Sequence, residues 1–291
     1  MTGKRLYRVR RILFGENVRP VLLQSENGPC ALLAMANTLF LRGRLEIHED
    51  VNSLGFDELV SMIVNLLLDK PNSTDDHISG AVRLLPHLDE GMHVNPFFGD
   101  AGRFEVSSEL SIFSLFEIPV YHTWVVSEED DSVFPYLGGI SYDQASLLLA
   151  SAPSSPSAAP SLQPEGLQEI SKWLRTNASQ TTVDGVAQVA GRVQQGTTAV
   201  LFRNNHFSTV TSKDGTLYAL ATDESLADED GAVWERIDQV DGNTVFVDMT
   251  FQSFRVQAKP IPPGQAERRA LTSYPSAPAV RRPNKKSCII C

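Results

Sequence analysis

Cys30 is the residue whose setting most favours covalent chemistry. It is the only cysteine outside the last four residues, and it opens the apolar run 30–41 directly after Gly28 and Pro29. This pattern of an apolar run between Gly28-Pro29 and Gly43 predicts a buried helix that begins at Cys30 and ends before Gly43. The first turn of a helix presents open backbone N–H groups and the positive end of the helix dipole, and both favour a thiolate. Cys30 is therefore either a nucleophile or, as is common for buried cysteines, a packing residue.

Gln24 and His206 offer the two other groups that thiol catalysis needs. Gln24 lies six residues before Cys30, and its amide is a suitable donor to an oxyanion. His206 lies among strand-like stretches, with two asparagines directly before it. The stretches expected to pair in an antiparallel sheet are 198–202, 208–211 and 216–222, with a hairpin turn at 213–215. A histidine at the mouth of such a sheet, far in sequence from a cysteine at a helix start, is the papain-like arrangement. The alternative is a histidine that only caps a strand end.

Several long motifs resemble those of one enzyme family, in the same order along the chain. They are 20–34, 118–124, 140–144, 202–209 and 221–224. Together they resemble the MINDY family of deubiquitinases, cysteine proteases that cut lysine-48-linked ubiquitin chains, over roughly 7–248. The resemblance implies that Cys30 is the nucleophile, that His206 is the general base and then the acid, and that Gln24 is the oxyanion donor.

The resemblance leaves the residue that orients His206 open. Asp223, Ser208 and Thr222 all lie in the expected strands or directly after them, and any of the three is a suitable partner for an imidazole.

The resemblance also implies an apolar surface for the distal ubiquitin. The matching positions are Val94, Trp124, Tyr142 and Phe202. Aromatic anchors suit such a surface, although each of these residues is also a reasonable core residue.

Composition narrows the class of protein. The 291 residues are 42% apolar, enough for a sizeable core, and one cysteine in the body allows no disulfide there, which fits a reducing compartment. The sequence contains no run of eighteen apolar residues, so it predicts no membrane-spanning helix. The body is strongly acidic between basic ends, so we expect no nucleic-acid partner. A thiolate mechanism requires neither a metal nor another cofactor.

We expect an α+β fold of papain-like type, with helices packed on a small antiparallel sheet. Residues 1–257 would form one catalytic domain, acting as a monomer, with a low-complexity insertion at about 150–165 rich in Pro, Ser and Ala. Further helices are expected at 56–68, 78–85, 167–174 and 182–194, with another that opens at a capping signal at 107–113. The N-terminal segment 1–14 resembles the family's first strand.

The basic tail 258–291 is expected to be disordered and ends in Cys288-Ile-Ile-Cys291. This ending fits a prenylation box with an unusual last residue, and four nearby basic residues would supply the second membrane signal. A zinc half-site is the other interpretation, but the chain has no second cysteine pair. We therefore expect a cytoplasmic protein that is partly anchored to membranes through Cys288.

Together with the resemblance, these features predict a thiol-dependent deubiquitinase that hydrolyses isopeptide bonds in lysine-48-linked polyubiquitin, as the resemblance implies. Two alternatives remain: a catalytically silent, membrane-tethered ubiquitin-binding adaptor, and a papain-like acyl transferase.

Overall fold

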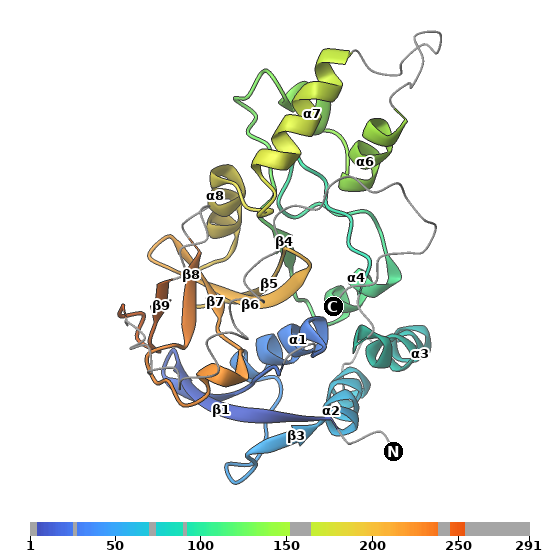
Figure 1. The fold of residues 1–291 in the computed structure, drawn as a ribbon. Helices are drawn as coiled ribbons and strands as arrows, with labels where there is room; N and C mark the ends of the chain where they lie inside the picture. Colours follow the sequence, from blue (N-terminus) through green and yellow to red (C-terminus); the bar gives the residue numbers. More distant parts are fainter. Residues whose placement is uncertain are drawn as a thin grey trace, which may run out of the picture.

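Two sheets and a central helix form the body of the protein in the computed structural model, which describes residues 5–25, 28–69, 74–89, 92–151, 164–237 and 245–253 (Figure 1). The smaller sheet is antiparallel in the order β2-β1-β3, built from β1 (Leu6–Phe14), β2 (Asn17–Leu22) and β3 (Ser53–Gly55). The larger sheet has the order β4-β5-β6-β7-β8-β9. Its strands are β4 (Val120–His122), β5 (Thr198–Arg203), β6 (His206–Lys213), β7 (Thr216–Leu220), β8 (Trp234–Ile237) and β9 (Val245–Val247).

The expectation of one small antiparallel sheet misses two features of this arrangement. A separate sheet forms at the N-terminal end of the chain, and β4 pairs with β5 in parallel. A parallel pair needs a long crossover connection, which the chain supplies through the helices between β4 and β5.

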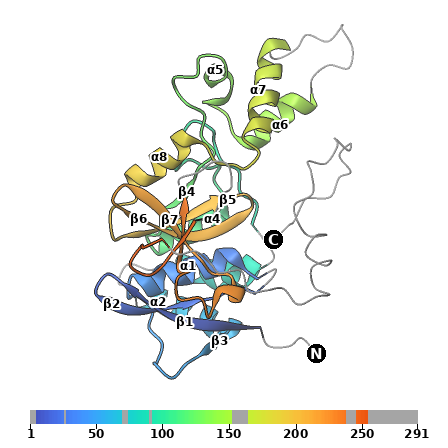
Figure 2. The same ribbon diagram turned by 60° about the vertical axis from the view of Figure 1, so that its left-hand side comes forward.

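Helix α1 (Cys30–Leu41) lies between the two sheets, as Figure 2 shows. Every residue of the helix is buried, which matches its apolar composition on all sides. Asn37 joins α1 to the smaller sheet, because its side chain accepts from Leu22 N at 2.7 Å and donates to Leu22 O at 3.0 Å. On the other side, Thr209 Oγ1 of β6 donates to Ala34 O at 2.9 Å.

The remaining helices form two groups (Figure 1). The first group packs beside α1 and comprises α2 (Phe56–Leu68), α3 (Asp75–Leu84) and α4 (Ser108–Leu115), with a 3₁₀ turn at Leu85–Asp89. The second follows β4 and comprises α5 (Phe134–Leu137), α6 (Tyr142–Ala150), α7 (Pro164–Thr176) and α8 (Val183–Arg192). Helices α5, α6 and α7 share a separate aromatic core around Phe98, Trp124 and Trp173.

Most of the expected helices are confirmed. Helix α2 has the expected bounds, Ser107 caps α4 by accepting from Leu110 N at 3.0 Å, and Thr182 caps α8 by accepting from Gly185 N at 3.0 Å. The low-complexity insertion and the tail fall largely or wholly outside the described residues, so the domain boundaries stay predictions.

Candidate active site

Cys30 is a buried thiol at the first position of α1, with 6% of its surface exposed. The turn before it is tight, because Cys30 N donates to Gly28 O at 2.9 Å, and the first helical bond follows, from Leu33 N to Pro29 O at 3.0 Å. The expected helix start is therefore confirmed. The thiol lies where the α1 dipole presents its positive end.

Gln24 is held firmly beside this turn. Its backbone N donates to Thr222 O at 2.6 Å and its carbonyl accepts from Glu224 N at 3.0 Å, which ties it to the segment after β7. Its side chain points back to the turn, where Nε2 donates to Gly28 O at 3.0 Å.

The Gly28 carbonyl oxygen thus accepts from two donors, Gln24 Nε2 and Cys30 N. A side-chain amide and the backbone N–H of a nucleophile, converging on one oxygen, form the geometry of an oxyanion hole. In this structure an oxygen of the chain itself occupies that position. This contact could not be predicted from residue types, since it depends on the backbone of a turn.

Two contacts define how the β5–β6 hairpin lies along α1. At the C-terminal end of the helix, Arg42 Nε donates to Thr198 Oγ1, on the first residue of β5, at 3.1 Å. At the middle of the helix, Ala34 O accepts from Thr209 of β6. Strand β5 therefore runs back along α1, and the turn between β5 and β6 lies at the N-terminal end of the helix.

His206 is the first residue of β6, so this register brings it to the same end of α1 as Cys30. The residue is exposed, yet enough protein surrounds the ring to desolvate it. This desolvation lowers the pKa of His206 below its ordinary value, and the positive charge of Arg203 lowers it further. Neutral imidazole, the form that accepts a proton, is therefore favoured.

None of the three expected orienting residues is hydrogen-bonded to the His206 ring in the described part of the chain. Asp223 accepts from Ser225 N at 2.8 Å and caps a 3₁₀ turn, Glu224–Leu226. The carbonyl oxygen of Thr222 accepts from the backbone N of Gln24. Ser208 lies two residues along β6, where strand alternation places it on the same face as His206.

The four positions expected to contact ubiquitin fall into two places. Trp124 and Tyr142 lie together, with ring centroids 5.4 Å apart, but Trp124 is only 5% exposed whereas Tyr142 is 40% exposed. Phe202 is 7% exposed and packs on Phe207, and Val94 is partly buried against the same core as Phe202. Only Tyr142 offers a large open surface.

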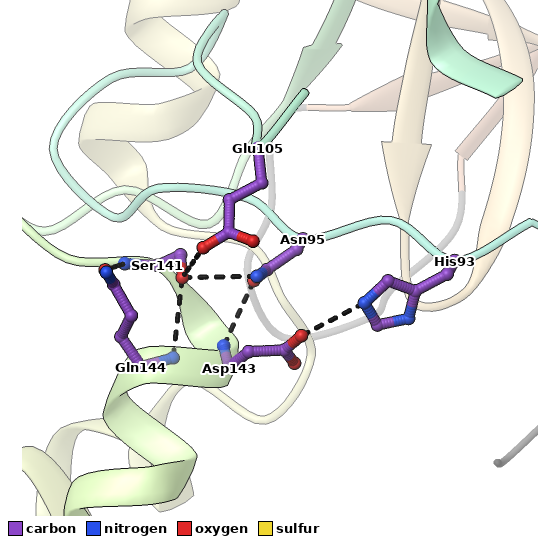
Figure 3. Close-up of polar contacts among 6 residues, drawn as sticks. All are labelled: His93, Asn95, Glu105, Ser141, Asp143 and Gln144. Atoms are coloured by element: carbon purple, nitrogen blue, oxygen red, sulfur yellow. Dashed lines mark hydrogen bonds and ion pairs between the residues drawn. The ribbon is translucent and has the colours of Figure 1, made fainter. Parts of the chain in front are cut away.

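A polar network joins the residues on both sides of Tyr142 to Asn95, Glu105 and His93 (Figure 3). Ser141 caps α6 in a capping box with Gln144, in which Ser141 N donates to Gln144 Oε1 at 2.9 Å. The Ser141 hydroxyl donates to Glu105 Oε1 at 2.8 Å and accepts from Asn95 Nδ2 at 3.2 Å. The Ser-x-x-Gln spacing at 141–144 is a recognisable signal for this helix start, but Asn95 and Glu105 are distant in sequence and gave none.

The network continues to Asp143, which follows Tyr142. Asp143 N donates to Asn95 Oδ1 at 3.0 Å, and its carboxylate lies 3.0 Å from His93 Nε2 (Figure 3). The residues on both sides of Val94 are therefore tied to the first turn of α6.

The described residues contain no group of three or more His, Cys, Asp or Glu side chains placed to hold a metal ion. No helix in that part of the chain is both long enough and apolar enough to cross a membrane.

Comparison with known proteins agrees with these motifs. The family model for MINDY deubiquitinases matches residues 5–251. The chain is 34% identical over 254 residues to "Ubiquitin carboxyl-terminal hydrolase MINDY-1" of Bos taurus, covering 84% of this chain and 54% of that protein. It is 33% identical over 258 residues to "Ubiquitin carboxyl-terminal hydrolase MINDY-2" of Homo sapiens, covering 86% of this chain and 41% of that protein. The chain thus spans about half the length of the first of these relatives and less than half the length of the second. The match over nearly all of the described fold shows that the chain belongs to the MINDY deubiquitinase family.

Proposed function

We propose that this chain is a thiol-dependent deubiquitinase that hydrolyses isopeptide bonds in lysine-48-linked polyubiquitin. The observation that carries the proposal is the convergence of Gln24 Nε2 and Cys30 N on one oxygen, at the end of α1 where β6 begins with His206. The relatives named as ubiquitin carboxyl-terminal hydrolases support the substrate class.

The chemistry proceeds in two halves. His206 takes the proton of the Cys30 thiol, and the thiolate attacks the isopeptide carbonyl carbon. The developing oxyanion takes the position of the Gly28 oxygen, where Gln24 Nε2 and Cys30 N donate to it. When the C–N bond breaks, imidazolium at His206 gives its proton to the lysine amine, which leaves a thioester between Cys30 and the ubiquitin C-terminus. Water, deprotonated by His206, then hydrolyses the thioester and the Cys30 thiol is restored.

This mechanism requires the turn before α1 to move. The Gly28 carbonyl occupies the position that the substrate oxygen needs, so substrate binding must turn it away. The arrangement of helix-start cysteine and strand-start histidine also supports a papain-like type for the catalytic domain.

We assign ubiquitin contact on the α6 side to Tyr142, because its ring is the exposed one. Trp124 lies behind it and supports it, while Phe202 and Val94 pack beside the catalytic end of the sheet. The choice of linkage would depend on how two linked ubiquitins bind at once to the surface around Tyr142 and to the catalytic end of the sheet.

The test is incubation of the full chain with tetra-ubiquitin of each linkage type, read on a gel. We expect shorter chains from the lysine-48 substrate alone, and no products with Cys30→Ala, which should still bind chains within about threefold of the wild-type affinity. Cleavage of another linkage would contradict the specificity. Binding without cleavage by the wild type would support the silent adaptor, and transfer of ubiquitin to an added amine in preference to water would support the acyl transferase.

A further inference from the structure

The turn that carries His206 is held from outside its own hairpin. Asn204 and Asn205 join β5 to β6 as a two-residue turn with φ values of 53° and 58°. Both residues are exposed, and asparagine tolerates this left-handed backbone. The Asn204 N–H is not left to water: it donates to Gln180 Oε1 at 2.8 Å.

Gln180 is itself fixed in the connection between α7 and α8. Its own φ is 56°, its backbone N donates to Asn177 O at 3.0 Å, and its carbonyl accepts from Thr123 Oγ1 at 3.0 Å. Thr123 is fully buried at the end of β4 and directly precedes Trp124. Gln180 therefore joins three segments that are far apart in sequence: the end of α7, the end of β4 and the hairpin turn before His206.

Thr123 is a rigid support. The N–H of Thr182 donates to Thr123 O at 2.9 Å, and Gly185 lies so close to the same carbonyl that a Cβ there would collide with it. The Gln180 carbonyl is bonded to a residue that cannot shift easily, so its side chain can hold the exposed turn in one place.

The His206 ring, in contrast, receives no hydrogen bond from the described residues that were expected to orient it. Its position depends on the backbone of the hairpin, and small displacements of a catalytic group cost a large part of the rate.

We propose that Gln180 is a positioning residue that fixes the His206 turn against the Thr123–Trp124 segment. This inference rests on the proposed function, since it assigns Gln180 a role in presenting the base to Cys30. Gln180 does not touch substrate or reacting atoms.

Three substitutions separate positioning from folding. Gln180→Glu keeps an acceptor oxygen at the same reach and should retain kcat within about twofold. Gln180→Ala removes the acceptor, and Gln180→Asn keeps an amide and suits the left-handed backbone but is one methylene too short. Both should lower kcat about three- to tenfold with KM within about twofold of wild type.

Gln188 provides a matched control. Its Oε1 accepts from the backbone N of Ala101 at 3.0 Å, the same kind of bond, but it joins α8 to the loop before α4 and makes no contact with the hairpin turn 204–205 among the described hydrogen bonds. Gln188→Ala should lower the melting temperature about as much as Gln180→Ala while leaving kcat within twofold.

A measurement that needs no activity completes the test. We expect the NMR signals of the His206 ring to shift or broaden in Gln180→Ala, and to be restored in Gln180→Glu, together with faster hydrogen exchange at Asn204 N–H in the alanine variant alone. Unchanged His206 signals and unchanged kcat in Gln180→Ala would overturn the inference. A wild-type chain that cleaves no ubiquitin substrate would overturn the proposed function instead, and the NMR comparison would still decide the role of Gln180.

Discussion

The Gly28 carbonyl oxygen joins two of the three residues on which catalysis would depend. Gln24 and Cys30 both donate to it, and His206 begins the neighbouring strand at the same end of α1. Under the proposed function, the turn must move before a substrate oxygen can take this position. If the substrate is polyubiquitin, as proposed, its contacts elsewhere on the surface would have to supply the free energy for this displacement.

Gln24→Ala should lower turnover about a hundred- to a thousandfold, because it removes one of two donors to the oxyanion. Chain binding should survive, since Gln24 faces the turn and not the exposed aromatic surface. Single-turnover rates and binding isotherms on lysine-48-linked chains test this. A loss of affinity with turnover per bound chain intact would make Gln24 a substrate contact.

The pH profile of kcat/KM should have an acid limb below pH 6.5, because the pKa of His206 lies below its ordinary value and the neutral ring is needed as base. Arg203→Gln removes a positive charge that lowers this pKa, so the limb should move to higher pH. Arg83→Gln, on the exposed face of α3, is the control and should leave the limb unchanged. A limb that stays in place in Arg203→Gln would argue against His206 as the titrating base.

At the scale of elements, the β5–β6 hairpin and α1 form the framework of the site. The hairpin has a tight two-residue turn, and the side chains of Thr209 and Arg42 fix it along the helix. The turn residues therefore matter for stability as well as for the place of His206.

Asn205 adopts a φ of 58°, so glycine should be accepted there and a β-branched residue should not. We expect Asn205→Gly to leave the free energy of unfolding unchanged or slightly higher, and Asn205→Val to lower it by about 1–2 kcal/mol. Urea unfolding of both variants measures the difference. Equal stability of the two would mean that the turn relaxes to another conformation.

The elements that sequence predicted well are those whose signals are local. Helix α1 has an apolar run with a Gly-Pro start, and α4 has its serine cap, so their beginnings could be placed from the residues alone. Strands β4, β8 and β9 are three or four residues long and are defined by partners elsewhere in the sheet. Such short pieces have too few residues to show an alternating pattern.

The same distinction holds within the candidate site. Cys30, Gln24 and His206 were found from residue type and motif, whereas the Gly28 carbonyl and Gln180 were not. Both depend on backbone geometry that only the folded chain provides: a tight turn before α1, and a left-handed turn held by an amide 24 residues earlier in sequence.

For the molecule as a whole, buried polar groups make stability depend on pH. His122 is 1% exposed, its Nε2 lies 2.9 Å from Asp100 O, and its Nδ1 accepts from Trp124 N at 3.2 Å. Burial lowers the pKa of His122 to about 4, because the charged ring cannot be hydrated there. The neutral ring joins the β4 end to the aromatic core beyond it.

Stability should therefore fall as the pH drops from 6.5 toward 4, because the unfolded chain binds the His122 proton before the folded chain does. The free energy of unfolding should be about 2–3 kcal/mol lower at pH 4.5 than at pH 7.5 from this group. In the His122→Gln variant, the free energy of unfolding measured in urea should differ much less between these two pH values. The pKa of Asp100 is lowered to about 2, chiefly by the Arg192 hydrogen bond. The stabilisation from this carboxylate is lost mainly as the pH falls below the ordinary value of 3.8, so it changes little between pH 7.5 and 4.5.

The C-terminal tail lies outside the described residues, and its role is a proposal from the sequence. We propose that Cys288 is prenylated and that the basic residues before it add membrane affinity of about 1 kcal/mol each on anionic leaflets. Cys288→Ser should release the protein to the cytosol without changing cleavage of soluble chains. Intact-mass analysis of protein from eukaryotic cells decides the modification, since an unmodified C-terminus that retains Cys291 contradicts it.

The parallel pairing of β4 with β5 has a consequence for the integrity of the protein. The long crossover between these strands separates the chain into two portions, with Cys30 and Gln24 before it and His206 after it. Under the proposed function neither portion would hold a complete site, so a chain with a proteolytic nick in the crossover should be active only while the two pieces stay associated. The buried contact of Thr209 with Ala34 and the part-buried contact of Arg42 with Thr198 join the two pieces without any covalent bond. The protein is in this sense a natural candidate for a split enzyme, whose activity would report the encounter of its halves.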